Sequence, residues 1–301
     1  MRVLITGATG LIGSHVTRLC HEKGIGVNYL STSKGKIEKK DNYKGFYWNP
    51  SEGEMDLKAL EGVNAIINLV GASIAKPWTD SNKKAIVNSR TETAKLLFDV
   101  LSKNEHSVDQ FISASAIGIY PSSKDKLYAE DETAVDDSFV GKVVVKWESA
   151  VNNFQDIGID VTKIRIGLVL AKNGGMLEKL KQPAGFNVGA PLGDGKQWQS
   201  WIHIEDLANI FIHALENELS GTYNAVAPNP VTNKELVKCV AKTMGKAMWL
   251  PNVPAIVLKT LLGEMSTIVL SSQLVSNNKI ESTGFGFKYS HLSNALQDLL
   301  Q

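Results

Sequence analysis

The sequence predicts a doubly wound α/β fold, in which helices cover both faces of a mostly parallel sheet. Short apolar runs alternate with helical stretches through the first half of the chain, and a glycine-rich turn follows the first apolar run. This alternation requires right-handed crossovers between parallel strands. After about Leu170 the alternation gives way to a segment dense in glycine and proline. We therefore expect a smaller C-terminal lobe.

The first strand is expected in RVLIT. A helix follows the glycine-rich turn and ends near Gly24, because glycine suits a helix C-terminus. Two longer helices are expected over about residues 80–103 and 139–156, and further strands in VNYLS, GFYW, AIINLV, FISAS and VTKIRIGLVL. We expect a first domain over residues 1–170 and a mixed α/β lobe over residues 171–301, partly interleaved with the first.

Composition excludes several classes of protein. Hydrophobic residues make up 43% and charged residues 21% of the 301 residues, which is ordinary for a globular protein. The formal net charge of +1 argues against nucleic acid or an anionic membrane as the main partner. Neither a membrane-spanning run nor a leader before MRVLIT is evident, so we expect a cytoplasmic protein. We expect it to be a monomer or a homodimer. Cys20 and Cys239 have no disulfide-like or metal-binding spacing, and no metal is expected.

The turn TGATGLIG places Gly7, Gly10 and Gly13 between a strand and a helix. Glycines at this spacing allow a tight turn and let the backbone approach a pyrophosphate at the helix N-terminus. A glycine-rich turn that binds nothing is the alternative. Its position after the first strand of a βαβ unit favours a dinucleotide site.

The end of the second strand distinguishes the two nicotinamide cofactors. NAD-binding proteins usually carry an Asp or Glu there, which binds the ribose 2′-hydroxyl. This chain has Ser31, Thr32, Ser33 and Lys34, with no acid before Glu38. Hydroxyls and an ammonium favour a 2′-phosphate, so we expect NADP(H) in preference to NAD(H). A solvated polar turn is the alternative.

Arg90 interrupts an apolar stripe on the expected helix over residues 80–103. The stripe is formed at steps of three and four by Ile86, Arg90, Ala94, Leu97 and Leu101. A buried cation needs an anion or several acceptors. Either a cofactor or a structural salt bridge could supply them.

Taken together, six segments resemble the YfcH-like epimerase-family proteins of the extended short-chain dehydrogenase/reductase superfamily. They are TGATGLIG, NLVGASI, SASAIGIY, VKWESA, PLGDGKQWQSWIHIEDL and APNPVTNKEL. The resemblance covers nearly the whole chain, including the C-terminal LLGEM segment. It implies a Rossmann-type domain that binds NADP, and an epimerase or oxidoreductase activity whose substrate is mostly undemonstrated in known members.

By position, the resemblance also implies a set of cofactor-binding residues. Many relatives carry an arginine where this chain has Thr32, and this departure weakens the preference for NADP. The implied residues are Gly7, Thr9, Gly10, Leu11, Ile12, Gly13, Ser31, Thr32, Ser33, Leu69, Val70, Gly71, Arg90 and Val169.

The superfamily's catalytic Tyr-x-x-x-Lys pair is expected in the helix after the fifth strand. At those positions this chain has Val140 and Val144, as the YfcH-like group also lacks the pair. Tyr120 and Lys124, in YPSSK, have the right spacing, but they precede that helix and Pro121 disfavours helical geometry. We interpret YPSSK as a coincidence of spacing.

Two hydroxyls remain as catalytic candidates. Ser115 ends the fifth strand and corresponds best to the superfamily's catalytic serine, although it could equally serve the backbone. Tyr120 could supply a phenol, or pack beneath a loop. We expect His203 to be structural, whereas Trp198 and Trp201 could line a substrate cleft or pack the lobe.

Three functions remain open from the sequence. The first is an NADP-dependent epimerase or oxidoreductase acting on a small polar substrate, of nucleotide-sugar type, through an atypical site. The second is a sensor that binds NADP(H) without turnover. The third is an interaction scaffold, such as a division-related protein. The missing acid–base pair opposes the first, because its loss typically costs two to four orders of magnitude in rate.

Overall fold

The computed structural model describes residues 1–301, which form two compact units that alternate along the chain. Unit 1 comprises Met1–Ser115, Val143–Ile164 and Ala208–Thr222. Unit 2 comprises Ala116–Lys142, Arg165–Leu207 and Tyr223–Gln301. The domain limit predicted at residue 170 falls within the second segment of unit 2.

The main sheet confirms the predicted doubly wound fold. Its strands follow the order β13-β9-β7-β6-β1-β2-β4-β3, and β5 pairs with β4. The pairs β4–β2, β2–β1, β1–β6 and β6–β7 are all parallel, whereas β3 and β5 pair antiparallel with β4. The strands are β1 (Arg2–Thr6), β2 (Gly26–Ser31), β3 (Lys39–Lys40), β4 (Tyr43–Asn49), β5 (Glu54–Met55), β6 (Ala65–Asn68), β7 (Gln110–Ala116), β9 (Asp160–Ile166) and β13 (Gly221–Ala225).

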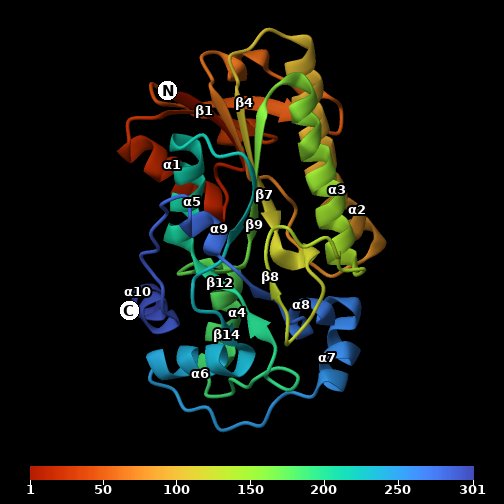
Figure 1. The fold of residues 1–301 in the computed structure, drawn as a ribbon, viewed down its shortest axis with the longest axis vertical. Helices are drawn as coiled ribbons and strands as arrows, with labels where there is room; N and C mark the ends of the chain where they lie inside the picture. Colours follow the sequence, from red (N-terminus) through yellow and green to blue (C-terminus); the bar gives the residue numbers. More distant parts are fainter. The chain divides into compact units, whose positions relative to one another are not determined.

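Helices cover both faces of this sheet (Figure 1). On one face lie α1 (Leu11–Glu22) and α5 (Ile204–Glu216), and on the other lie α2 (Asp80–Lys103) and α3 (Phe139–Asn152). The bounds of α2 are those predicted, and the Thr79 side chain caps its start by accepting the Asn82 N–H. The helix predicted to end near residue 156 ends at Asn152 and continues as a short 3₁₀ segment, η4 (Asn153–Ile157).

The expected strand VTKIRIGLVL is wrong as a single element, because it breaks at Gly167. A Cβ at this position would lie 2.3 Å from the Ser200 carbonyl oxygen, so only glycine lets the two backbones approach. Beyond the break, β10 (Leu168–Ala171) leaves the main sheet and pairs with β12 (Trp201–His203). The run VTKIRIGLVL is therefore divided at Gly167 between the main sheet and the β10–β12 pair.

Unit 2 is built from two-stranded sheets and short helices. Besides β10–β12, the pairs are β8 (Leu127–Tyr128) with β15 (Leu274–Val275), and β11 (Trp198–Gln199) with β14 (Val231–Thr232). Its helices are α4 (Gly175–Gly185), α6 (Asn233–Thr243), α7 (Ala255–Leu262), α8 (Ser266–Leu270), α9 (Asn278–Glu281) and α10 (Leu292–Leu300). Helix α6 packs against α4 and α10. None of the helices in the chain is long and apolar enough to cross a membrane.

Buried hydrogen bonds join the carboxyl ends of three neighbouring strands of unit 1. The Thr6 hydroxyl of β1 donates to Asn68 Oδ1 of β6 at 2.7 Å, and Asn68 Nδ2 donates to Ser113 Oγ of β7 at 3.1 Å. All three side chains are fully buried. Because buried polar groups are stable only when paired, this chain of contacts fixes the strand ends relative to one another.

Candidate functional site

The glycine turn after β1 is packed so closely that side chains are excluded from it. Gly7 has φ +73°, and a Cβ there would lie 3.1 Å from the Leu69 carbonyl carbon. At Gly13 a Cβ would lie 2.1 Å from the Gly7 carbonyl oxygen. The turn therefore closes directly onto the first turn of α1, as the glycine spacing predicts.

The N-terminus of α1 is open to a ligand. Gly10 is its N-cap, no side chain caps the helix, and its first turn contains no acid. Thr9 and Gly10 are exposed, while Leu11 and Ile12 are half-buried. The first N–H groups of a helix lack partners within it, and its dipole favours an anion at this end. These residues fit a pyrophosphate.

The loop after β6 is held beside the same turn. The Thr6 hydroxyl oxygen accepts the N–H groups of Leu69 and Val70, at 3.1 and 3.3 Å. The family resemblance implies that these residues lie along a cofactor, and a buried threonine holds their backbone in place. Gly71 follows, and a Cβ on it would lie 2.9 Å from the Arg90 guanidinium carbon.

The loop after β2 contains hydroxyls and an ammonium without a carboxylate. The Ser31 hydroxyl oxygen accepts the Ser33 N–H at 3.1 Å. This hydroxyl therefore stabilises the conformation of the loop. Thr32, Ser33 and Lys34 are exposed. The Lys34 ammonium lies 4.8 Å from the centre of the Tyr47 ring. The exposed groups can bind an anion without repulsion from a neighbouring acid.

Arg90 is a half-buried cation whose partners in the structure are uncharged. Its Nη1 donates to the carbonyl oxygens of Ile86 at 2.9 Å and Ala72 at 3.2 Å. Its guanidinium lies 4.9 Å from the centre of the Trp147 ring. Burial lowers the pKa of Arg90 to about 10. The structural salt bridge considered as an alternative is not what holds this side chain.

Ser115 lies beside a carboxylate that the sequence reasoning missed. Its hydroxyl donates to Glu148 Oε1 at 2.6 Å, and both side chains are buried in unit 1. Glu148 follows Val144 by one helical turn, so it belongs to the face of α3 that is otherwise apolar. In the sequence, the position of this acid within the apolar stripe of the helix could have identified Glu148 as a candidate site residue.

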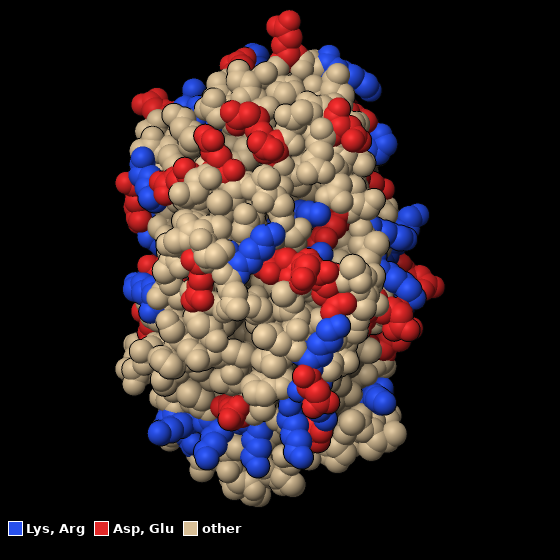
Figure 2. All heavy atoms as spheres, in the orientation of Figure 1, with Lys and Arg blue, Asp and Glu red and all other residues tan.

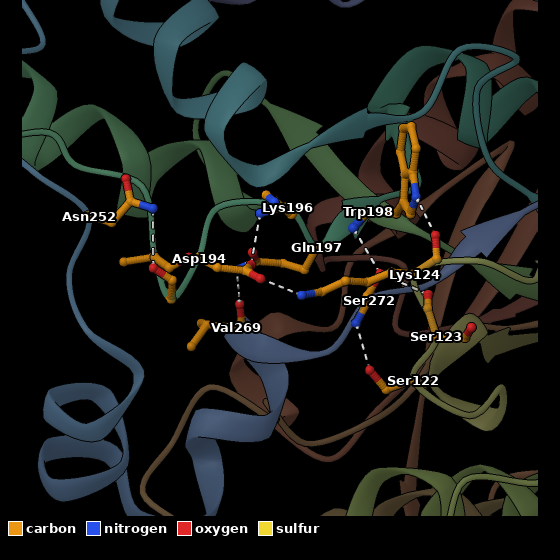
Figure 3. A network of polar contacts seen from close by, with 12 residues as sticks. Ser122, Ser123, Lys124, Asp194, Lys196, Gln197, Trp198, Asn252, Val269 and Ser272 are labelled. Atoms are coloured by element: carbon orange, nitrogen blue, oxygen red, sulfur yellow. Dashed lines mark hydrogen bonds and ion pairs between the residues drawn. The ribbon is translucent and has the colours of Figure 1, made fainter.

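Tyr120 and Lys124 do not contact one another through their functional groups. The Tyr120 hydroxyl donates to Asn224 Oδ1 at 2.8 Å and accepts a hydrogen bond from Arg165 Nη1 at 2.9 Å. Lys124 instead forms an ion pair with Asp194, in the loop before β11, as Figure 3 shows. Both side chains of that pair are about half exposed.

The cation beside Tyr120 is therefore Arg165, which the sequence analysis did not select. Arg165 is buried in β9 between Ile164 and Ile166, and a cation between two apolar residues is the same kind of signal that identified Arg90. Burial raises the pKa of Tyr120, although the contacts with Arg165 and Asn224 act in the opposite direction. Tyr120 is 1% exposed and stacks on Tyr128, so the ring packs within unit 2.

The remaining candidates lie in unit 2. His203 is 2% exposed, its Nδ1 accepts the Glu205 N–H, and burial lowers its pKa, as expected of a structural histidine. Trp201 is fully buried, and the Trp198 indole N–H donates to the Lys124 carbonyl oxygen (Figure 3). Val169 lies half-buried in β10. Nowhere in the chain do three His, Cys, Asp or Glu side chains converge as they would to hold a metal ion.

Comparisons with known proteins agree with this geometry. Residues 3–225 match the model of the NAD dependent epimerase/dehydratase family, and residues 253–299 match a domain of unknown function, DUF1731. An epimerase family protein of Staphylococcus epidermidis is 34% identical over all of this chain and 99% of its own length. The epimerase family protein YfhF of Bacillus subtilis is 35% identical over all of this chain and 98% of its own.

Solved structures have the same fold. The human epimerase family protein SDR39U1 (isoform 2), crystallised with NADPH, superimposes with a TM-score of 0.86 at 28% identity, covering 99% of both chains. A nucleoside-diphosphate sugar epimerase of Corynebacterium glutamicum gives a TM-score of 0.79 at 30% identity, over all of this chain and 58% of that one. The chain thus has the NAD(P)-binding Rossmann fold of the extended short-chain dehydrogenases, and it belongs to the NAD dependent epimerase/dehydratase family.

Proposed function

We propose that the protein binds NADP(H) in unit 1 and prefers it to NAD(H). The observation that carries this proposal is the acid-free loop Ser31–Lys34, which follows β2 in the position where NAD-binding proteins carry a carboxylate. The human relative crystallised with NADPH supports the same cofactor. Within unit 1, the cofactor-binding set then comprises the glycine turn, the loop residues Ser31, Thr32 and Ser33, the Leu69–Gly71 loop and Arg90.

The test is a fluorescence titration of the protein with NADPH and with NADH. We expect tighter binding of NADPH, because the loop offers donors to a 2′-phosphate. Thr32→Arg should widen the difference, since it adds a bidentate donor where many relatives carry arginine. Equal affinities for the two cofactors in the wild type would contradict the assignment of this loop.

We further propose an oxidoreductase or epimerase activity on a small polar substrate of nucleotide-sugar type. When bound, NADP(H) supplies or accepts a hydride. The chain's own contribution is Ser115, whose oxygen accepts the proton of a substrate hydroxyl while its own proton passes to Glu148 Oε1, 2.6 Å away. Reduction of a carbonyl uses the same steps in reverse. This pair handles the proton that a Tyr-x-x-x-Lys pair handles elsewhere in the superfamily.

Tyr120 is the second hydroxyl candidate for the same role. Its oxygen already takes part in two hydrogen bonds, with Asn224 and Arg165. We therefore assign the proton transfer to Ser115, with Glu148 as the group that takes up the Ser115 proton.

Glu148→Gln separates these roles. Glutamine keeps an oxygen that can accept the Ser115 hydrogen bond but cannot take up the proton, so NADPH binding should persist while turnover falls by at least a hundredfold. The assay is NADPH oxidation with a panel of sugar-derived ketones and aldehydes. Unchanged turnover in both Glu148→Gln and Ser115→Ala would remove this pair from the mechanism.

Binding of NADP(H) without turnover is the second candidate function. The observation that favours it is the apolar α3 face, where buried Val144 stands at an expected catalytic position. Tight NADPH binding, with no oxidation by any carbonyl compound of the panel, would favour this sensor over the enzyme.

A further inference from the structure

Basic side chains, drawn blue, gather at the lower end of the view in Figure 2, where α6 lies in Figure 1. Lys234, Lys238 and Lys242 follow one another at intervals of four residues and are exposed, so they share one face of the helix. Residues 233–250 contain four lysines and a single acid, Glu235. The Glu235 carboxylate is engaged by the N–H and hydroxyl of Thr232 in the capping box of α6.

Two large aromatic side chains are exposed on segments that adjoin α6. Phe186, just after α4, is 81% exposed, and Trp249, in the loop after α6, is 70% exposed. Their segments are joined where Asn187 Oδ1 accepts the Ala247 N–H at 3.2 Å. Single exposed apolar side chains are ordinary, but two exposed aromatic rings beside a row of cations are a feature that requires a reason.

We propose that this basic-aromatic patch, formed by Lys234, Lys238, Lys242, Phe186 and Trp249, binds the surface of an anionic lipid bilayer. Lysines near such a surface gain about 1 kcal/mol each from the negative potential. Aromatic rings that project beyond a basic face enter the boundary between headgroups and acyl chains. The net charge of +1 for the whole chain conceals this local excess, because acids elsewhere balance it.

The charge pattern favours a bilayer over a second copy of the chain. A twofold symmetric dimer through this patch would place the two lysine rows against one another, which costs free energy. An acidic protein would match the lysines, but it would also need pockets for two aromatic rings carried on separate segments. The fluid boundary of a bilayer accepts both rings without preformed pockets.

Sedimentation of the full chain with lipid vesicles tests the proposal. We expect binding to vesicles of phosphatidylcholine with phosphatidylglycerol at low salt, weak binding to phosphatidylcholine alone, and loss of binding as salt is added. The double variant Lys238→Glu/Lys242→Glu should bind anionic vesicles at least tenfold more weakly. Trp249→Ala should weaken binding several-fold at unchanged charge.

The matched control is Lys44→Glu/Lys58→Glu, which reverses two exposed lysines of unit 1 and should bind like the wild type. Circular dichroism verifies that each variant is folded. The proposal is overturned if the wild type does not bind anionic vesicles at low salt. It is likewise overturned if Lys238→Glu/Lys242→Glu and the control Lys44→Glu/Lys58→Glu lose binding equally. A third result would also overturn it: the wild-type protein forms a dimer, Trp249→Ala dissociates that dimer, and the wild type binds no vesicles.

Discussion

Replacing Arg90 with methionine should separate cofactor binding from stability. Burial lowers the pKa of Arg90 to about 10, which corresponds to roughly 3 kcal/mol of unfavourable charge burial at about 1.4 kcal/mol per pH unit. Methionine removes that cost and keeps the aliphatic volume. It also loses the hydrogen bonds to Ala72 and Ile86 and the contact with the Trp147 ring, each about 1 kcal/mol. These opposing contributions nearly cancel.

We therefore expect the free energy of unfolding of the free Arg90→Met protein to change by less than about 1 kcal/mol, whereas NADPH binding weakens tenfold or more. Urea denaturation and a fluorescence titration measure the two quantities. Lys95→Met, an exposed position on the same helix, is the control and should leave the NADPH dissociation constant unchanged. A loss of about 3 kcal/mol or more with unchanged NADPH affinity would show that Arg90 is a structural cation.

Three further predictions follow from contacts on both units. Gly13→Ala should lower the free energy of unfolding by about 3 kcal/mol and more than Gly10→Ala does, because its Cβ would overlap the Gly7 carbonyl oxygen at 2.1 Å rather than 3.2 Å; equal losses in urea denaturation would contradict the packing. Lys124→Ala should change stability by less than about 1 kcal/mol and turnover by no more than a few-fold, since its ion pair with Asp194 is half exposed. A thousandfold loss of NADPH oxidation would make Tyr120 and Lys124 the reacting pair. Because burial holds the pKa of His203 below 6.5, the unfolded chain takes up the proton first as pH falls. Stability should therefore decline below about pH 6.5, and His203→Asn should flatten that decline in urea denaturation.

Much of the first half of the fold could be read from local sequence. The apolar runs RVLIT and AIINLV are short and continuous, and their strands β1 and β6 are buried at the centre of the sheet, where the polar Thr6 and Asn68 side chains pair with one another. The glycine turn could be predicted equally well, because the positive φ of Gly7 and the close approach of Gly13 to the Gly7 carbonyl oxygen lie within the turn itself. Such features depend on neighbours in sequence.

The partners of isolated polar residues could be decided only by the tertiary structure. Ser115 and Glu148 are 33 residues apart, and Tyr120 meets Asn224 across 104 residues, so no spacing rule relates them. The break at Gly167 likewise depends on a carbonyl oxygen 33 positions later, at Ser200. Local sequence was enough to predict the fold class, the glycine turn and the lack of an acid after β2. The folded chain decided which carboxylate lies beside the serine and which cation lies beside the tyrosine, because hydrogen bonds of this kind form only after distant strands and helices have packed.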